Sequence, residues 1–168
     1  MLTNHSPTAL RSSILPSTLV GGMLSGTLDA ISAFATFGSG MTYGIASGIL
    51  GSKAFPAAGG GGAAIWSLGL ALHYLIALSA AAIYGFASCK FSFLKDHFVV
   101  CGVFFGIGVY LVMNLVVLPL SAVPFPIGPF SVSALRAGLV AHIILIGLPI
   151  SSSVWFFSKR KVDHGNAH

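Results

Sequence analysis

Polar side chains that could handle protons or cations lie inside otherwise apolar stretches of the sequence: Asp29, His73, Asn114 and His142. A charged aspartate at the centre of a membrane span costs about 2.5–3.5 kcal/mol on insertion scales, so it needs a partner or a proton. Two imidazoles offer such partners, and Arg136, near the start of the last apolar stretch, could snorkel or reach toward Asp29. We predict a hydrogen-bonded polar core of Asp29, His73 and His142 that can hold a proton or a cation.

The two histidines, His73 and His142, leave three interpretations open. They can form hydrogen bonds that fix one helix to another, they can belong to a proton or ion pathway, or they can ligate a metal or a haem axially. No His-x-x-x-His pair or carboxylate doublet supports the third. A haem, if bound, would give a visible Soret band.

Motifs typical of enzymes are missing from the sequence. It has no Gly-x-Ser-x-Gly elbow and no glutamate, so serine-hydrolase chemistry and paired-glutamate acid–base catalysis are not supported. Cys89 and Cys101 are not part of a Cys-x-x-Cys or Cys-His cluster, and we interpret them as packing residues. We expect no catalytic residue, no metal and no cofactor, with haem or metal at His73 and His142 as the minor alternative.

The composition explains what must surround these polar groups. Of 168 residues, 55% are hydrophobic and only 7% are charged, whereas a soluble domain has about a quarter charged. Such a chain is predicted to be an integral membrane protein. Its net charge of +5 is scattered between apolar segments and forms no contiguous basic patch, so we expect no nucleic-acid partner. We also predict no soluble partner; the lipid bilayer itself is the expected environment.

Four stretches meet the requirement of about 20 mostly apolar residues for a helical span: 18–37, 64–88, 98–120 and 132–158. They do not alternate as the strands of a membrane barrel do. The first stretch is longer than the apolar region of a signal peptide and contains Asp29, so we interpret it as a span. The sequence therefore predicts an all-α, integral membrane four-helix bundle. It consists of an N-terminal tail (1–17), one transmembrane domain (18–158) and a basic C-terminal tail (159–168).

The segment between the first two spans holds a further helical pattern. Met41–Gly51 has apolar residues at helical spacing but is too short to cross a bilayer. It predicts a short interfacial or re-entrant helix. The four glycines Gly59–Gly62 are not followed by Gly-Lys-Ser/Thr, so they indicate a flexible hinge and not a phosphate-binding loop.

Basic residues predict the orientation of the spans. With the N-terminus in the cytoplasm, the inner side carries Arg11, Lys90, Lys95 and the cluster Lys159–Lys161. Only Lys53 and Arg136 then lie outside, which agrees with the positive-inside rule. We expect a bacterial cytoplasmic (inner) membrane protein with both termini in the cytoplasm.

Small residues predict which helix faces meet, because close packing drives helix association in lipid. The predicted packing glycines are Gly22, Gly26, Gly69, Gly102, Gly106 and Gly138. Each small-residue stripe also contains one of the four polar residues, which are therefore expected to point inward. With a rise of about 1.5 Å per residue, all four lie roughly 9–15 Å below the outer ends of their spans, in one layer. Pro119 and Pro149 are expected to kink the third and fourth helices.

Several segments resemble an uncharacterised family of small bacterial inner-membrane proteins of the YagU type: SGTLDAISAF, IASGILG, LHYLIA, MNLVVLPLSA and HIILIGLPI. The resemblance implies a four-helix inner-membrane protein with histidines in the second and fourth helices, which match His73 and His142. The resemblance also implies an acidic residue one turn before the histidine of the last helix. At that position this chain has Gly138. Asp29 would then have to supply the carboxylate from another helix.

The leading functional hypothesis is proton- or cation-linked transport or stress tolerance through the polar layer. The alternative is a non-catalytic structural or accessory membrane subunit in which the same layer only holds the helices together. Because four spans leave little room for a path, transport would need a homo-oligomer, and the glycine stripe at Gly22 and Gly26 could supply its contact.

Overall fold

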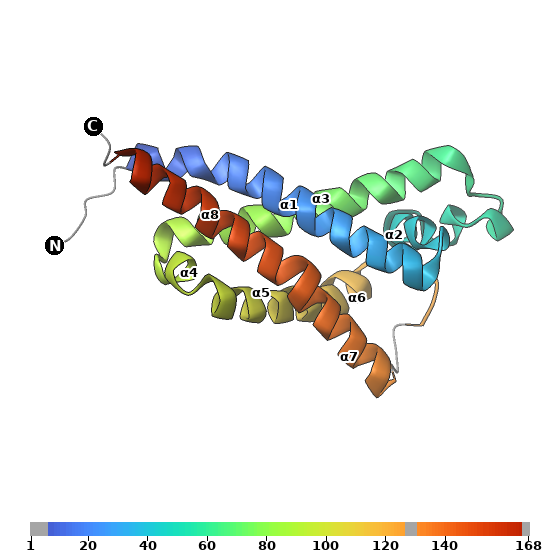
Figure 1. Ribbon diagram of the computed structural model, residues 1–168. Coiled ribbons are helices and arrows are strands. Elements are labelled where there is room, and N and C mark those ends of the chain that lie inside the picture. The colour runs from blue at the N-terminus through green and yellow to red at the C-terminus, as the bar shows by residue number, and fades with distance from the viewer. Residues whose placement is uncertain (1–6, 127–130, 166–168) are drawn as a thin grey trace.

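The computed structural model describes residues 7–126 and 131–165, and side chains over 14–126 and 131–159 (Figure 1). All regular elements in these ranges are helical. Their bounds are α1 (Pro7–Phe37), α2 (Gly40–Leu50), η1 (Gly51–Ala54), η2 (Pro56–Ala58), α3 (Gly62–Lys90), α4 (Phe93–Asp96), α5 (Phe98–Val112), η3 (Met113–Val117), α6 (Leu118–Leu120), α7 (Val132–Ala141), η4 (His142–Gly147) and α8 (Leu148–Gly165). The predicted all-α class is confirmed.

Within the described residues, four helices are long and apolar enough to cross a membrane: Ile14–Phe37, Gly62–Lys90, Phe98–Leu120 and Val132–Lys159. They correspond to the four predicted spans. The helix of the first span begins at Pro7, well before the predicted start of that span. The predicted orientation also relies on the charges of Arg11, Arg160 and Lys161, which lie outside the residues with described side chains.

The four long helices pack in an order that differs from their order in the chain. α1 packs against both α3 and α8, while the fourth helix, α7–η4–α8, packs against α5. Figure 1 shows that the first turn of α1 and the last turn of α8 lie together at one end of the bundle and that α7 diverges from the other helices at the opposite end. Between α3 and α5, the rings of Tyr84 and Phe105 meet edge to face at 4.9 Å.

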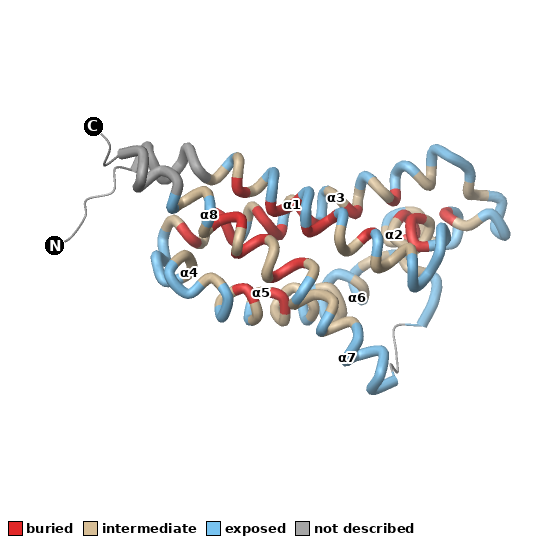
Figure 2. The backbone as a smooth tube through the Cα atoms, in the orientation of Figure 1, coloured by how far each residue is buried: buried red, intermediate tan, exposed pale blue. Residues whose placement is uncertain are grey.

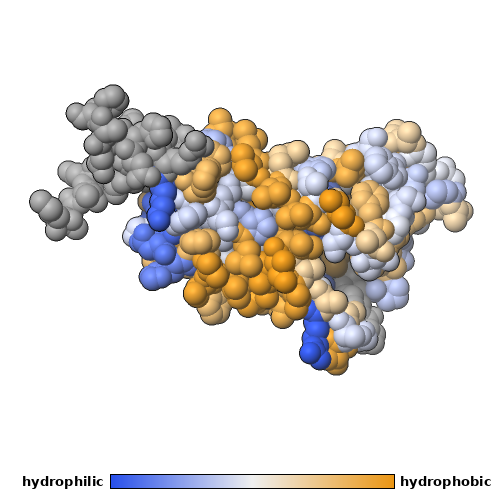
Figure 3. All heavy atoms as spheres, in the orientation of Figure 1, coloured by the Kyte–Doolittle hydropathy of each residue, from blue (hydrophilic) through white to orange (hydrophobic). Residues whose placement is uncertain are grey.

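The buried core is small and lies between α3 and α8. Its members are Ala80, Ala81, Tyr84, Ile146, Ile150 and Val154. Figure 2 shows the buried positions on the facing sides of α1, α3, α5 and α8. Large apolar side chains instead cover the outer surface, among them Leu115 (70% exposed) and Leu120 (82%), and Figure 3 shows hydrophobic atoms gathered over the middle of the visible face. Exposed apolar patches of this extent mark a surface that contacts lipid or a partner.

The short helix predicted near Met41–Gly51 is present as α2. It packs against α3, where the carbonyl of Thr42 lies directly against Gly69. The backbone N–H of Ala122 donates to the carbonyl of Gly48 over 2.9 Å, so α2 also holds the segment that follows α6. Beyond α2, the turns η1 and η2 are closed by hydrogen bonds such as Gly60 N–H to Phe55 O at 3.1 Å, where the sequence indicated a hinge.

Each of the two prolines in the third and fourth helices follows a π-helical turn. Before Pro119, the N–H of Leu118 donates to Met113, five residues earlier. Before Pro149, the N–H of Leu148 donates to Ile143 in the same way. A proline removes one helical hydrogen bond and its ring collides with the carbonyl four residues earlier. A wider π turn relieves this collision and satisfies the freed backbone groups inside the helix.

Candidate functional site

His73 connects α3 to α1. Its side chain is 8% exposed, and Nε2 donates to the carbonyl oxygen of Gly26 over 2.8 Å. The absence of a side chain at Gly26 permits this approach, since a Cβ there would lie 2.9 Å from Tyr74 Cδ1 and 3.1 Å from Ala77 Cβ. The hydroxyls of Tyr74 and Thr27 form a second bond between the two helices, at 3.0 Å.

Asp29 lies less than one turn beyond Gly26 on α1, about 4.5 Å further along the axis. It is half-buried, and it is on the same side of the helix as Ser25 and Gly26, which are buried. Among the described side chains, no hydrogen bond or ion pair involves its carboxylate. Arg136, which we expected within reach of Asp29, is exposed on the diverging helix α7 and forms no ion pair with any described residue.

His142 and Asn114 meet around Tyr110, on the other side of the bundle. His142 is half-buried in η4, and its Nδ1 donates to the carbonyl of Gly138, one turn earlier in its own helix, over 2.8 Å. Its ring stands edge to face against Tyr110 of α5 with 5.2 Å between ring centroids. Asn114 Nδ2 donates to the carbonyl of Tyr110 over 2.8 Å. Both polar side chains thus bind a carbonyl four residues before them.

Contacts between antiparallel helices indicate the level of each group. On α1 and α8, a Cβ at Gly21 would lie 3.4 Å from Ile150 Cα. Asp29 lies eight residues after Gly21 on α1, and His142 lies eight residues before Ile150 on the fourth helix. Because the two helices are antiparallel, both residues lie about 12 Å from this contact, toward the same end of the bundle. His73 is bonded to α1 within a turn of Asp29. Asp29, His73 and His142 therefore lie at about the same level on three helices.

No hydrogen bond joins these three groups to one another. Both histidines bind backbone carbonyls, so the bonded Asp29–His73–His142 core that the sequence predicted is absent from the described side chains. The physical reason is the backbone: a helix carbonyl lies within reach of each imidazole, and α7 diverges from α1 just beyond η4 (Figure 1).

The six glycines expected at helix contacts all lie against another helix. Gly22 faces Leu78, Gly26 faces Tyr74, Gly69 faces Thr42, Gly102 faces Ser151, Gly106 faces Ile143, and Gly138 faces Tyr110. The stripe at Gly22 and Gly26 is thus covered by α3 of the same chain. This contact lies within one chain, and the expected homo-oligomer stays a prediction.

Sequence reasoning missed Gly147 as a packing residue. A Cβ there would collide with the backbone of Gly102 and Gly106 on α5, so three glycines form the crossing of α5 with η4. The spacing of Gly102 and Gly106, four residues apart, is typical of such close helix crossings and could have indicated a small partner on the fourth helix.

No site for a metal ion is formed by three or more histidine, cysteine, aspartate or glutamate side chains in the described ranges. The thiols of Cys89 and Cys101 are free and donate to the carbonyls of Gly85 and Phe93 at 3.6 and 3.7 Å. What the site offers chemically is a carboxylate without a partner among the described groups and two imidazoles that each retain one ring nitrogen without a hydrogen bond.

Comparison of the chain with protein-family models, with curated proteins and with solved structures gave no match. The resemblance to YagU-type proteins stays a prediction.

Proposed function

We propose that the chain is a multi-pass protein of a bacterial cytoplasmic membrane that takes up protons or small cations at Asp29 and, as a homo-oligomer, passes them across the membrane. Four apolar helices with large exposed apolar side chains support the membrane location. Lys90, Lys95 and Lys159 lie at the end of the bundle where α1 begins and α8 ends, which supports an orientation with the termini in the cytoplasm.

The observation that carries the proposal is the isolation of Asp29. A carboxylate inside a span costs several kcal/mol when it is neither paired nor protonated. Asp29 is half-buried, forms no bond with the described side chains, and lies level with His73 and His142. A proton or a cation is the simplest partner that removes this cost.

The histidines can take part in proton movement through their second nitrogens. Because Nε2 of His73 donates to Gly26, its Nδ1 is the accepting nitrogen of the neutral ring. In His142 the roles are reversed: Nδ1 donates to Gly138 and Nε2 accepts. Each ring can therefore bind a proton without breaking the bond that holds it.

The test is proton and cation flux in liposomes, with Asp29→Asn compared with Asp96→Asn. Asp96 lies outside the four long helices, in α4, so its substitution removes the same charge without altering the bundle interior. We expect flux with the unmodified protein, loss of flux with intact unfolding stability in Asp29→Asn, and retained flux in Asp96→Asn. Absence of flux from the unmodified protein under every gradient of protons, sodium or potassium would refute the proposal.

A second candidate, a structural or accessory membrane subunit, is favoured by the hydrogen bonds of the histidines. Both imidazoles already bind helix carbonyls, as polar groups that stabilise helix packing do. This candidate predicts that His73→Leu lowers the free energy of unfolding and that neither the parent nor any variant conducts ions.

A further inference from the structure

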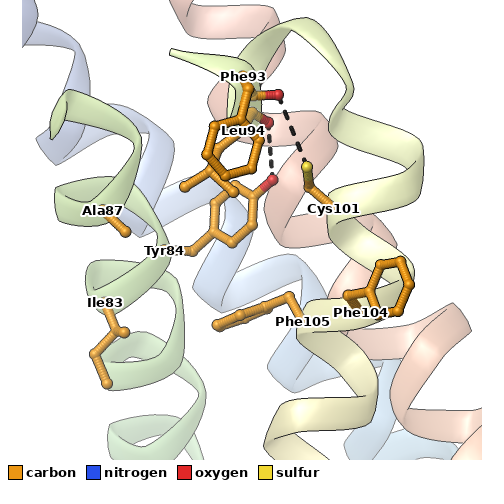
Figure 4. Close-up of a pocket in the computed structure, with 8 residues that line it drawn as sticks. All are labelled: Ile83, Tyr84, Ala87, Phe93, Leu94, Cys101, Phe104 and Phe105. Carbon is orange, nitrogen blue, oxygen red and sulfur yellow. Dashed lines mark hydrogen bonds between the residues drawn. The ribbon is translucent and has the colours of Figure 1, made fainter. Parts of the chain in front are cut away.

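An apolar cavity of ≈ 470 Å³ lies between α3 and α5, at the end of the bundle where α4 connects them (Figure 4). Its wall includes Ala87 of α3, Leu94 of α4, and Cys101 and Phe104 of α5. The volume falls within the range of small-molecule sites, about 300–1,000 Å³. The site is distinct from the level of Asp29, which lies toward the other end of α1.

The wall of the cavity offers carbon atoms and almost no free polar group. Figure 4 shows that the hydroxyl of Tyr84 is directed to the carbonyl of Leu94, to which it donates over 2.9 Å, and that the thiol of Cys101 is directed to Phe93. With both donors already used, a polar metabolite or peptide would lose hydrogen bonds to water and gain none here. A hydrocarbon chain suits such a wall.

The cavity opens toward the outside of the bundle and not toward its centre. Three large apolar side chains at its rim are exposed: Ile83 (64%), Phe93 (52%) and Phe104 (69%). In the membrane location proposed above, the molecules that reach this opening are lipids. An acyl chain can therefore enter from the side.

Three lysines lie near the end of the cavity that is closest to α4. Lys90 follows Ala87 by three residues, about 4.5 Å along α3, and Lys95 follows Leu94 directly. Lys159 also lies at this end, with Nζ 4.8 Å from the ring centroid of Trp155. Asp96 and His97 are the other described titratable groups of the connection, and both are exposed.

Among the described side chains at this end, three lysines outnumber the single carboxylate of Asp96, and none of them forms an ion pair with it, so the described charge here is positive. Figure 3 shows hydrophilic atoms gathered at the end of the visible face beside α4. Long lysine side chains next to a lipid-facing apolar surface extend toward phosphate groups at the membrane interface.

We propose that this cavity binds a single anionic phospholipid, with one acyl chain between α3 and α5 and its phosphate at Lys90 and Lys95. The inference rests on the membrane location in the proposed function and not on ion uptake at Asp29. The apolar wall selects a hydrocarbon chain, and Lys90 and Lys95, which form no ion pair with a described residue, select a negatively charged headgroup.

Native mass spectrometry of the delipidated protein in detergent tests this site. Dioleoyl phosphatidylglycerol and dioleoyl phosphatidylcholine have the same acyl chains, and only the first has a net negative charge. We expect the unmodified protein to bind phosphatidylglycerol more tightly. Because one lysine near an anionic surface is worth about fivefold in affinity, Lys90→Gln with Lys95→Gln should weaken phosphatidylglycerol binding about 25-fold and leave phosphatidylcholine binding unchanged.

Matched variants separate the chain site from the headgroup site. Lys53→Gln removes a lysine from the opposite end of the bundle and should change neither lipid's affinity. Ala87→Phe fills the cavity and should weaken both lipids, whereas Leu75→Phe, at a side chain 59% exposed elsewhere on α3, should weaken neither. The surface lysine variants keep the test decisive even if Ala87→Phe does not fold.

Equal affinity for the two lipids, or no response to the double lysine substitution, would overturn the lipid site. Ion flux together with that result would leave the proposed function standing. Lipid selectivity without ion flux would overturn ion uptake at Asp29 and support the lipid site, so the two failures can be told apart.

Discussion

At the crossing of α5 with η4, we predict that alanine destabilises the protein at one glycine of α5 and stabilises it at another, two residues away. A Cβ on Gly106 would lie 2.6 Å from the Cα of Ile143 and 2.7 Å from the carbonyl oxygen of His142. Both atoms belong to the backbone, so no rotamer change can remove the collision. A Cβ on Gly108, on the same helix, would have nothing within 4 Å.

The size of each effect follows from these contacts. Ordinary van der Waals contact for a Cβ begins at 3.4 Å, so Gly106→Ala must separate α5 from η4 by about 0.8 Å, a shift comparable with those caused by an overpacked core. Such overpacking costs typically about 2 kcal/mol, or about 30-fold in the ratio of folded to unfolded protein. Gly108→Ala relieves a helix of a glycine without a collision and should stabilise the protein by about 0.5–1 kcal/mol.

The assay is equilibrium unfolding in mixed micelles, followed by the fluorescence of Trp155. The Trp155 ring stacks on Phe98 of α5 with 4.7 Å between centroids, so its signal reports the contact between α8 and α5. Trp66, on α3, is replaced by phenylalanine in every variant to leave one fluorophore. If Gly106→Ala is as stable as Gly108→Ala, the backbone contact between α5 and η4 is not as close as described and the reasoning fails.

Two further predictions use the same unfolding measurement. His73→Leu removes a hydrogen bond between α3 and α1 and should destabilise the protein by about 1 kcal/mol. His142→Leu removes only a hydrogen bond within one helix and should destabilise it less. A larger loss of stability in His142→Leu than in His73→Leu would contradict the roles assigned to the two imidazoles. Ser153→Ala removes the buried 2.9 Å hydrogen bond from α8 to the carbonyl of Ser17 on α1 and should lower the free energy of unfolding by about 0.6 kcal/mol. The control is Ser79→Ala, because the exposed hydroxyl of Ser79 binds only the carbonyl of Leu75 in its own helix, and this substitution should change the stability little.

Composition and length predicted the long helices well, because a span must contain about 20 apolar residues whatever the bundle around it. The predicted third span, 98–120, begins and ends at the same residues as the long apolar helix Phe98–Leu120. The start of the first helix could not be found in this way. Residues from Pro7 onward continue the helix beyond the apolar stretch, and proline fits the first turn of a helix because its missing N–H has no partner there in any case.

The polar site was only partly predictable. Distance along a helix fixes depth, so arithmetic on the sequence could set Asp29, His73 and His142 at comparable levels. It could not choose their hydrogen-bond partners. A histidine can bind a side chain on a facing helix or a nearby carbonyl, and the choice depends on helix rotation and separation, which the sequence pattern does not contain. The close approach at Gly26 gives His73 the carbonyl.

The same limit applies to Asn114 and His142, and the prolines explain why. A proline four or more residues ahead disturbs the hydrogen-bond ladder, and the helix responds with a π turn before Pro119 and another before Pro149. Asn114 and His142 lie within these turns, and each donates to the carbonyl one turn earlier. Each side chain thus adds a hydrogen bond to a carbonyl beside the irregular backbone, in an apolar setting where water cannot. The side chain of Asp29 forms no such hydrogen bond with any described residue, and α1 is a continuous α-helix around this residue. Among Asp29, His73, Asn114 and His142, Asp29 is therefore the one whose presence the local fold does not explain, and for that reason the flux experiment substitutes it first.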